Sequence, residues 1–171
     1  MYTHLSNPTA PRILVEACKL IGIKEIVGSK HNPIILSWAK ELGLEKVYTN
    51  DEIPWCGLFV AYVAKQANVE VVKDPLWALN WAKYGTKSDV PMLGDILTFK
   101  RNGGGHVGIY VGEDDLCYHV LGGNQSNQVN VIRIEKYRLF QSRRTAWKVA
   151  QPKEVRVIKI DSKGTISKNE Q

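Results

Sequence analysis

Apolar positions in the first half of the chain recur at three- and four-residue intervals, the spacing of amphipathic helices. Gly22 follows the first such stretch, while Pro33 suits the first turn of the second and Gly43 ends it. In the third stretch Phe59 and Val63 belong to one apolar stripe. The pattern predicts helices over residues 11–20, 32–42 and 55–68, and a short helix over 76–84.

From residue 94 the pattern changes to the two-residue alternation of β-strands. Turn sequences separate the alternating stretches, at residues 102–103, 112–115 and 122–124. Strands are expected over residues 94–100, 106–111, 116–121 and 129–134, with a further one over 155–160. Helices followed by antiparallel strands indicate an α+β fold, with the N-terminal helices packed on one face of a small antiparallel sheet.

The 171-residue length and the 44% hydrophobic content favour one globular domain. We expect residues 1–150 to form this domain and residues 151–171 to add a basic C-terminal strand and a tail, with the last ten residues frayed. The chain has no apolar run of 18 residues, so no transmembrane segment is expected. The first residues lack the pattern of a signal peptide, which predicts synthesis in the cytoplasm and release by another route.

The chain has a net charge of +6. Many of its cations follow position 132, at Arg133, Lys136, Arg138, Arg143, Arg144, Lys148, Lys153, Arg156, Lys159, Lys163 and Lys168. Such clustering favours polyanions, yet no nucleic-acid-binding motif accompanies it. The expectation is therefore no nucleic-acid partner, and either a solvated basic surface or an attraction to acidic polymers of a cell envelope.

Two residues far apart in sequence carry candidate chemistry. Cys56 lies at the start of an expected helix, and His106 opens an expected strand after three glycines. A helix N-terminus and a nearby imidazole both lower the pKa of a thiol, so this pair predicts a nucleophilic cysteine. A third group must orient the imidazole. The spacing leaves Asn124, Gln125 and His119 open for that role.

The sequence resembles papain-like peptidoglycan hydrolases of the CHAP and NlpC types. Residues 54–60 (PWCGLFV) are similar to their nucleophile helix, and residues 94–99 (GDILTF) and 105–112 (GHVGIYVG) to their central strands. A phage-associated branch is resembled by residues 121–127 (LGGNQSN), 21–28 (IGIKEIVG) and 32–35 (NPII). The similarity spans residues 10–134, and the basic segment after it has no counterpart in the family.

The resemblance implies a papain-like fold and a cysteine amidase or endopeptidase that cleaves amide bonds in bacterial peptidoglycan. Carried over by position, Cys56 is the nucleophile and His106 the general base, with no metal or cofactor. An enzyme of this kind reaches the wall after release by a phage or another delivery machine.

The remaining roles follow from the same resemblance. CHAP members place an Asn or Glu after the strand that follows the histidine strand, which favours Asn124 as the orienting residue. NlpC-type members use an earlier polar residue, which favours His119. Asn50 or Asp51, just upstream of the nucleophile, would complete an oxyanion site with the backbone N–H of Cys56.

Two other functions compete with hydrolysis. Ligand types suited to zinc occur at Cys56, His106, Cys117 and His119, although their spacing matches no common zinc motif. A non-catalytic wall-binding module would instead present sugar-stacking tryptophans, at Trp38, Trp55, Trp77 and Trp81. Tryptophans are more often part of a core, which favours the enzyme.

Overall fold

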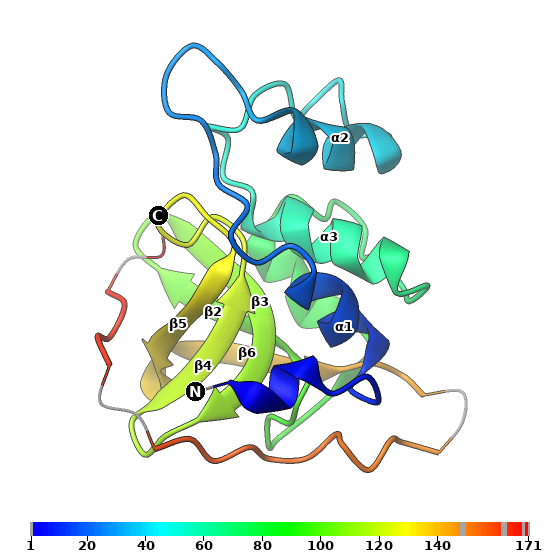
Figure 1. Cartoon of the computed structure of the whole chain (residues 1–171), viewed down its shortest axis with the longest axis vertical. Helices are drawn as coiled ribbons and strands as arrows, with labels where there is room; N and C mark the ends of the chain where they lie inside the picture. The colour runs from blue at the N-terminus through cyan, green and yellow to red at the C-terminus, as the bar shows by residue number, and fades with distance from the viewer. Residues whose placement is uncertain (1, 148–149, 162–163, 169, 171) are drawn as a thin grey trace.

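The computed structural model describes residues 2–147, 150–161, 164–168 and 170 (Figure 1). Its helices are η1 Thr3–Ser6, α1 Arg12–Cys18, α2 Pro33–Glu41, α3 Cys56–Gln66, η2 Ala78–Lys83 and η3 Lys136–Arg138. Its strands are β1 Thr86–Lys87, β2 Ile96–Arg101, β3 Gly104–Glu113, β4 Cys117–Gly122, β5 Asn130–Glu135 and β6 Leu139–Arg144. The strands form one antiparallel sheet in the order β1-β6-β2-β3-β4-β5, which confirms the α+β prediction.

Helix α3 lies between helices α1 and α2 on one side and the sheet on the other (Figure 1). Helices α1 and α2 pack on it, and it packs in turn on β3. Trp38 of α2 packs at a tilt against Trp55 and Phe59, with ring centroids 6.0 and 6.2 Å apart. Every residue from Cys56 to Ala61 is buried. The start of α3 is therefore held in place from several sides.

Strand β3 is buried from His106 to its end, so it has no solvated face. Helices α3 and η2 pack on it, and residues 158–160 cover it near Gly112. The covering segment forms one parallel bridge, between Glu113 and Lys159, where a further strand over residues 155–160 was expected.

Strand β6 was not expected from the sequence. It lies between β1 and β2, and its register on β2 shifts at Thr98. Its arginines are held by protein groups: Arg144 contacts both carboxylate oxygens of Asp95 at 2.8 and 2.9 Å, and Arg143 donates to the carbonyl of Tyr84. The polar side chains of β6 bind partners elsewhere in the chain. The strand therefore lacks the hydrophobic alternation by which a strand is predicted.

Much of the basic charge serves the fold. Ion pairs within the described residues join Arg133 to Asp114, Lys136 and Lys159 to Glu113, Arg138 to Glu170, and Arg144 to Asp95. Lys148 and Lys163 lie outside the described residues. Because these cations are paired with carboxylates, the basic segment offers fewer unpaired positive charges than the sequence suggested. Attraction to acidic polymers stays a prediction. Within the described ranges, no helix is long and apolar enough to span a membrane.

The C-terminal tail packs on the edge of the sheet. Ile166 forms a parallel bridge with Arg133 of β5, and the N–H of Ser167 donates to the Arg133 carbonyl at 2.8 Å. Glu170 is only 1% exposed. The expectation that the last ten residues are frayed is therefore wrong for residues 164–168 and 170.

Candidate active site

Cys56 is the first residue of α3, and its side chain is 4% exposed. Burial raises the pKa of the thiol, while the backbone N–H of Val107 and those of Gly57 and Cys56 itself act in the opposite direction. The N–H groups at the start of a helix lack partners within the helix. They are therefore available to a thiolate, or to an oxyanion formed beside it.

His106 lies on β3 directly before Val107, and the backbone N–H of Val107 reaches the thiol of Cys56. Its ring stacks on Phe99 with 6.5 Å between centroids, and its Nε2 lies 2.9 Å from Oε1 of Gln125. Burial lowers the pKa of His106 to about 4, and the charges of Arg101 and Arg138 act in the same direction. The imidazole is therefore neutral at pH 7.

The amide of Gln125 fixes which ring nitrogen of His106 carries the proton. The Gln125 NH₂ group donates to the Asn130 carbonyl at 2.7 Å, to Oδ1 of Asn130 at 2.9 Å and to the Val120 carbonyl at 3.3 Å. These acceptors leave Oε1 as the atom that faces His106, so Nε2 must be the donor. A neutral imidazole then has its lone pair on Nδ1, the form that a general base requires.

Two glycines let the chain after β4 reach this position. A Cβ atom at Gly122 would lie 2.6 Å from Oε1 of Gln125, and one at Gly123 would lie 2.6 Å from Cβ of Phe59. Asn124 then takes a left-handed conformation with φ of +54°. This turn directs Gln125, which is fully buried, back toward the imidazole.

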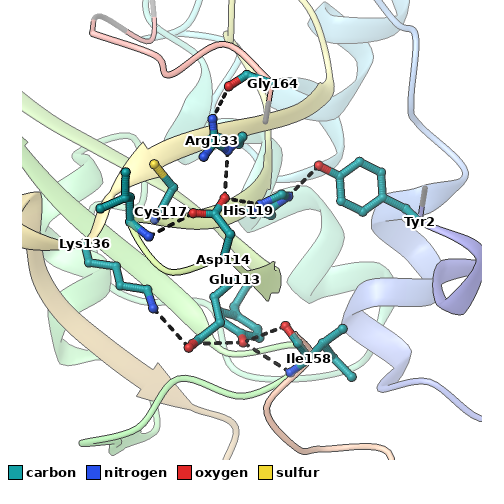
Figure 2. Close-up of polar contacts among 11 residues, drawn as sticks. Tyr2, Glu113, Asp114, Cys117, His119, Arg133, Lys136, Ile158 and Gly164 are labelled. Atoms are coloured by element: carbon teal, nitrogen blue, oxygen red, sulfur yellow. Dashed lines mark hydrogen bonds and ion pairs between the residues drawn. The ribbon is translucent and has the colours of Figure 1, made fainter. Parts of the chain in front are cut away.

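The structure brings Gln125 rather than Asn124 to His106. Asn124 is 6% exposed, and no hydrogen bond among the described residues joins its side chain to the imidazole. His119 is held elsewhere: Figure 2 shows its ring between the hydroxyl of Tyr2, 2.7 Å from Nδ1, and Asp114, 2.8 Å from Nε2. Spacing along the chain could not distinguish Asn124, Gln125 and His119, because the turn after β4 decides which side chain faces the imidazole.

The two residues expected at the oxyanion site serve other contacts. Asp51 is fully buried and accepts from the N–H groups of Ile26 and Asn32 at 2.9 and 2.8 Å, and it pairs with His31 at 2.9 Å. Burial acts to raise the pKa of Asp51, but these partners hold it below its ordinary value. Asn50 donates to Thr49 at 3.4 Å. Both carboxylate oxygens of Asp51 thus fix the loop before α2, and a role of Asp51 at an oxyanion site stays a prediction.

A pocket of about 550 Å³ opens at Cys56. Its walls are formed by residues 53–54 and by residues 76–80, a range that includes the start of η2. Arg101 and the glycines at positions 103–105 also line it. Trp77 stands in this wall and is 74% exposed, whereas Trp38, Trp55 and Trp81 are at most 1% exposed and belong to the core. Sequence reasoning missed Arg101 and this wall because loop residues far apart in the chain build it.

A larger pocket of about 640 Å³ lies at the end of β3 and beside β5, and Cys56 does not line it. Figure 2 shows that its polar groups already pair with one another: Asp114 accepts from Arg133 at 2.7 Å and from the N–H of Cys117 at 2.9 Å. His119 is held in the same network. The zinc hypothesis finds no support here, since no group of three or more His, Cys, Asp or Glu in the described part of the chain could hold a metal.

Comparison with known proteins gives one family. Residues 48–124 match the CHAP domain, a stretch that contains Cys56, His106, His119 and Asn124 and ends one residue before Gln125. No curated protein matches the chain. CHAP domains are typically cysteine- and histidine-dependent amidohydrolases, and the match indicates amidase or peptidase activity on peptidoglycan. The buried cysteine at a helix start and the histidine on the adjoining strand thus lie within a stretch similar to the CHAP domain, a match that supports the CHAP/papain-like cysteine peptidase superfamily.

Proposed function

We propose that this protein cleaves amide bonds in the peptides of bacterial peptidoglycan by a thiol mechanism. Cys56 is the nucleophile, His106 the general base and Gln125 the residue that orients the imidazole. The observation that carries the proposal is the hydrogen bond of 2.9 Å between Gln125 and Nε2 of His106, because it presents a neutral ring with a basic Nδ1.

The catalytic cycle is an acyl transfer in two halves. His106 Nδ1 accepts the thiol proton, and the thiolate of Cys56 forms a bond to the amide carbonyl carbon. Backbone N–H groups at the start of α3 stabilise the oxyanion while His106 returns the proton to the leaving amine. Water, activated by the same imidazole, then hydrolyses the thioester and regenerates the thiol.

Burial shapes the timing of proton transfer. It raises the pKa of Cys56 and lowers that of His106, so both groups are neutral before substrate arrives. The thiolate and imidazolium must therefore form together, each stabilised by the charge of the other. The enzyme then reacts in the bound complex and exposes no permanent thiolate to oxidation.

The wall-binding alternative has weaker support. Of the four tryptophans that it requires, Trp38, Trp55 and Trp81 are buried in the core and cannot stack on a sugar. Trp77 is exposed, yet it lines the same pocket as Cys56 and so fits the wall of a catalytic cleft equally well.

Digestion of purified peptidoglycan tests the activity. Wild-type protein, Cys56→Ala and the matched control Cys18→Ala would each be incubated with walls of several peptide chemistries, and the products resolved by mass spectrometry. Cys18 is a partly exposed thiol on α1, outside the pocket. We expect new stem-peptide fragments from wild type and Cys18→Ala but none from Cys56→Ala, and the fragment masses identify the bond. Full digestion by Cys56→Ala would refute the thiol mechanism.

Two neighbouring amides test the orienting role. Gln125→Ala removes the bond to His106, and we expect kcat to fall about 10- to 100-fold with little change in KM, because a buried N–H loses its acceptor and the ring loses its preferred tautomer. Asn124→Ala, the matched control, should keep kcat within about threefold of wild type, a loss of less than about 1 kcal/mol. The opposite ranking would assign the role to Asn124.

A further inference from the structure

Glu170 is a buried carboxylate that the mechanism above does not use. It is 1% exposed, and its two oxygens accept from the two terminal nitrogens of Arg138 at 2.8 and 2.9 Å. Arg138 belongs to η3, which precedes β6. This fork-to-fork pairing is strong and directional, so it fixes the position of the carboxylate.

The tail that carries Glu170 ends on the turn of the active site. The N–H of Ser126, the residue after Gln125, donates to the backbone carbonyl of Glu170 at 3.2 Å. Further back, Ile166 and Ser167 bind β5, and the Ser167 carbonyl accepts from Arg138 at 3.2 Å. In Figure 1 the red C-terminal segment follows β5 toward the yellow turn after β4. The tail thus lies outside the CHAP match but braces the turn that holds His106.

Glu170 and His106 also act on each other through their charges. The carboxylate raises the pKa of His106, and His106 in turn lowers that of Glu170. Two cations oppose this effect on the imidazole, Arg101 at the end of β2 and Arg138, and the thiol of Cys56 is neutral before reaction. Glu170 is therefore a carboxylate whose charge favours a protonated His106.

We propose that Glu170 is a positioning residue of this active site: held by Arg138 and by the Ser126 turn, its carboxylate favours the imidazolium that His106 becomes when it takes the thiol proton. The inference rests on the proposed roles of Cys56 and His106. Glu170 forms no bond to substrate and exchanges no proton. Its charge stabilises the ion pair in a buried site, where electrostatic interactions are stronger than in water.

The test measures alkylation of Cys56 by iodoacetamide across pH 5–9, resolved by mass spectrometry so that Cys18 serves as the reference thiol in the same molecule. The variants are Glu170→Gln, the double variant Glu170→Gln/Arg138→Gln, and His106→Ala. We expect Glu170→Gln to slow Cys56 alkylation at pH 7 about tenfold and to move thiolate formation to higher pH by about one pH unit. The double variant, which also loses an opposing cation, should lie between Glu170→Gln and wild type. Cys18 should react at an unchanged rate.

The outcomes separate the two proposals. If Cys56 reacts no faster in wild type than in His106→Ala, the proposed thiol–imidazole pair fails. If wild type is faster than His106→Ala but Glu170→Gln matches wild type at every pH, the role of Glu170 alone is overturned. An equal loss of rate at all pH values, together with a lower melting temperature, would also overturn it, because a purely structural tail does not shift a titration.

Discussion

Gly57, the residue after Cys56, permits a close approach that no other residue allows. A Cβ atom at this position would lie 2.3 Å from the carbonyl oxygen of Pro75 and 2.7 Å from that of Leu76. Real Cβ contacts essentially never fall below 3.0 Å, and both obstacles are backbone atoms. The substitution Gly57→Ala must therefore displace the chain at Pro75 or the first turn of α3 by about 0.7 Å, the difference between 3.0 and 2.3 Å.

The structure sets the size of the effect. Overpacking of this kind destabilises proteins by about 1–3 kcal/mol. The Pro75 carbonyl also accepts from the indole N–H of the buried Trp81 at 3.0 Å, and loss of that bond adds about 1 kcal/mol. Alanine recovers at most about 1 kcal/mol through its higher helix propensity. The net loss in free energy of unfolding is about 1–3 kcal/mol, which lowers the melting temperature by roughly 2–12 °C in a domain of this size.

Thermal and urea unfolding followed by circular dichroism measure this loss. Gly104→Ala is the control, since Gly104 lines the pocket at Cys56, has no atom within 4 Å of an added Cβ and has no left-handed backbone. We expect its free energy of unfolding to stay within about 0.5 kcal/mol of wild type. If Gly57→Ala and Gly104→Ala have the same free energy of unfolding, the close approach of residues 75–76 to α3 is refuted.

Two further predictions follow from burial. Because burial lowers the pKa of His106 to about 4, a catalytic base at this position stays neutral down to that value; the acid limb of kcat/KM should lie near pH 4, and a limb at the ordinary imidazole value of 6.5 would contradict the assignment. Trp81→Ala should lower the free energy of unfolding by about 3–5 kcal/mol in urea titrations, because it empties a fully buried site, whereas Trp77→Ala, at 74% exposure, should change it by less than about 0.5 kcal/mol. Equal losses in the two variants would show that Trp77 is part of the core.

Local pattern was enough to predict the elements that carry Cys56 and His106. Helix α3 was expected over residues 55–68 and spans Cys56–Gln66, because a helix buried by two helices and a sheet repeats its apolar residues regularly. Strand β3 was likewise expected over residues 106–111 and spans Gly104–Glu113. Such elements can be predicted without knowing which residues they pack against, since any apolar surface can cover a regularly repeated apolar face.

Elements stabilised by specific polar partners could not be predicted in the same way. Strand β6 ends in Arg143 and Arg144, and its place in the sheet depends on Asp95, about fifty residues earlier in the chain. The docked tail depends in the same way on the pairing of Glu170 with Arg138. Neither pairing leaves a periodic signal, because each joins side chains that lie far apart in the chain.

The position of Gln125 shows which signals the sequence did contain. The pair Gly122 and Gly123 marks the place where the chain passes between α3 and the imidazole, since a Cβ at either position would meet neighbouring atoms. One left-handed residue later, the next side chain is Gln125, whose NH₂ group is surrounded by carbonyl acceptors. A carboxylate there would face those same carbonyls without a proton to donate, so the position requires a neutral amide. Since His106 receives a neutral partner from Gln125, any negative charge that favours its protonated form must come from elsewhere, and the tail supplies it.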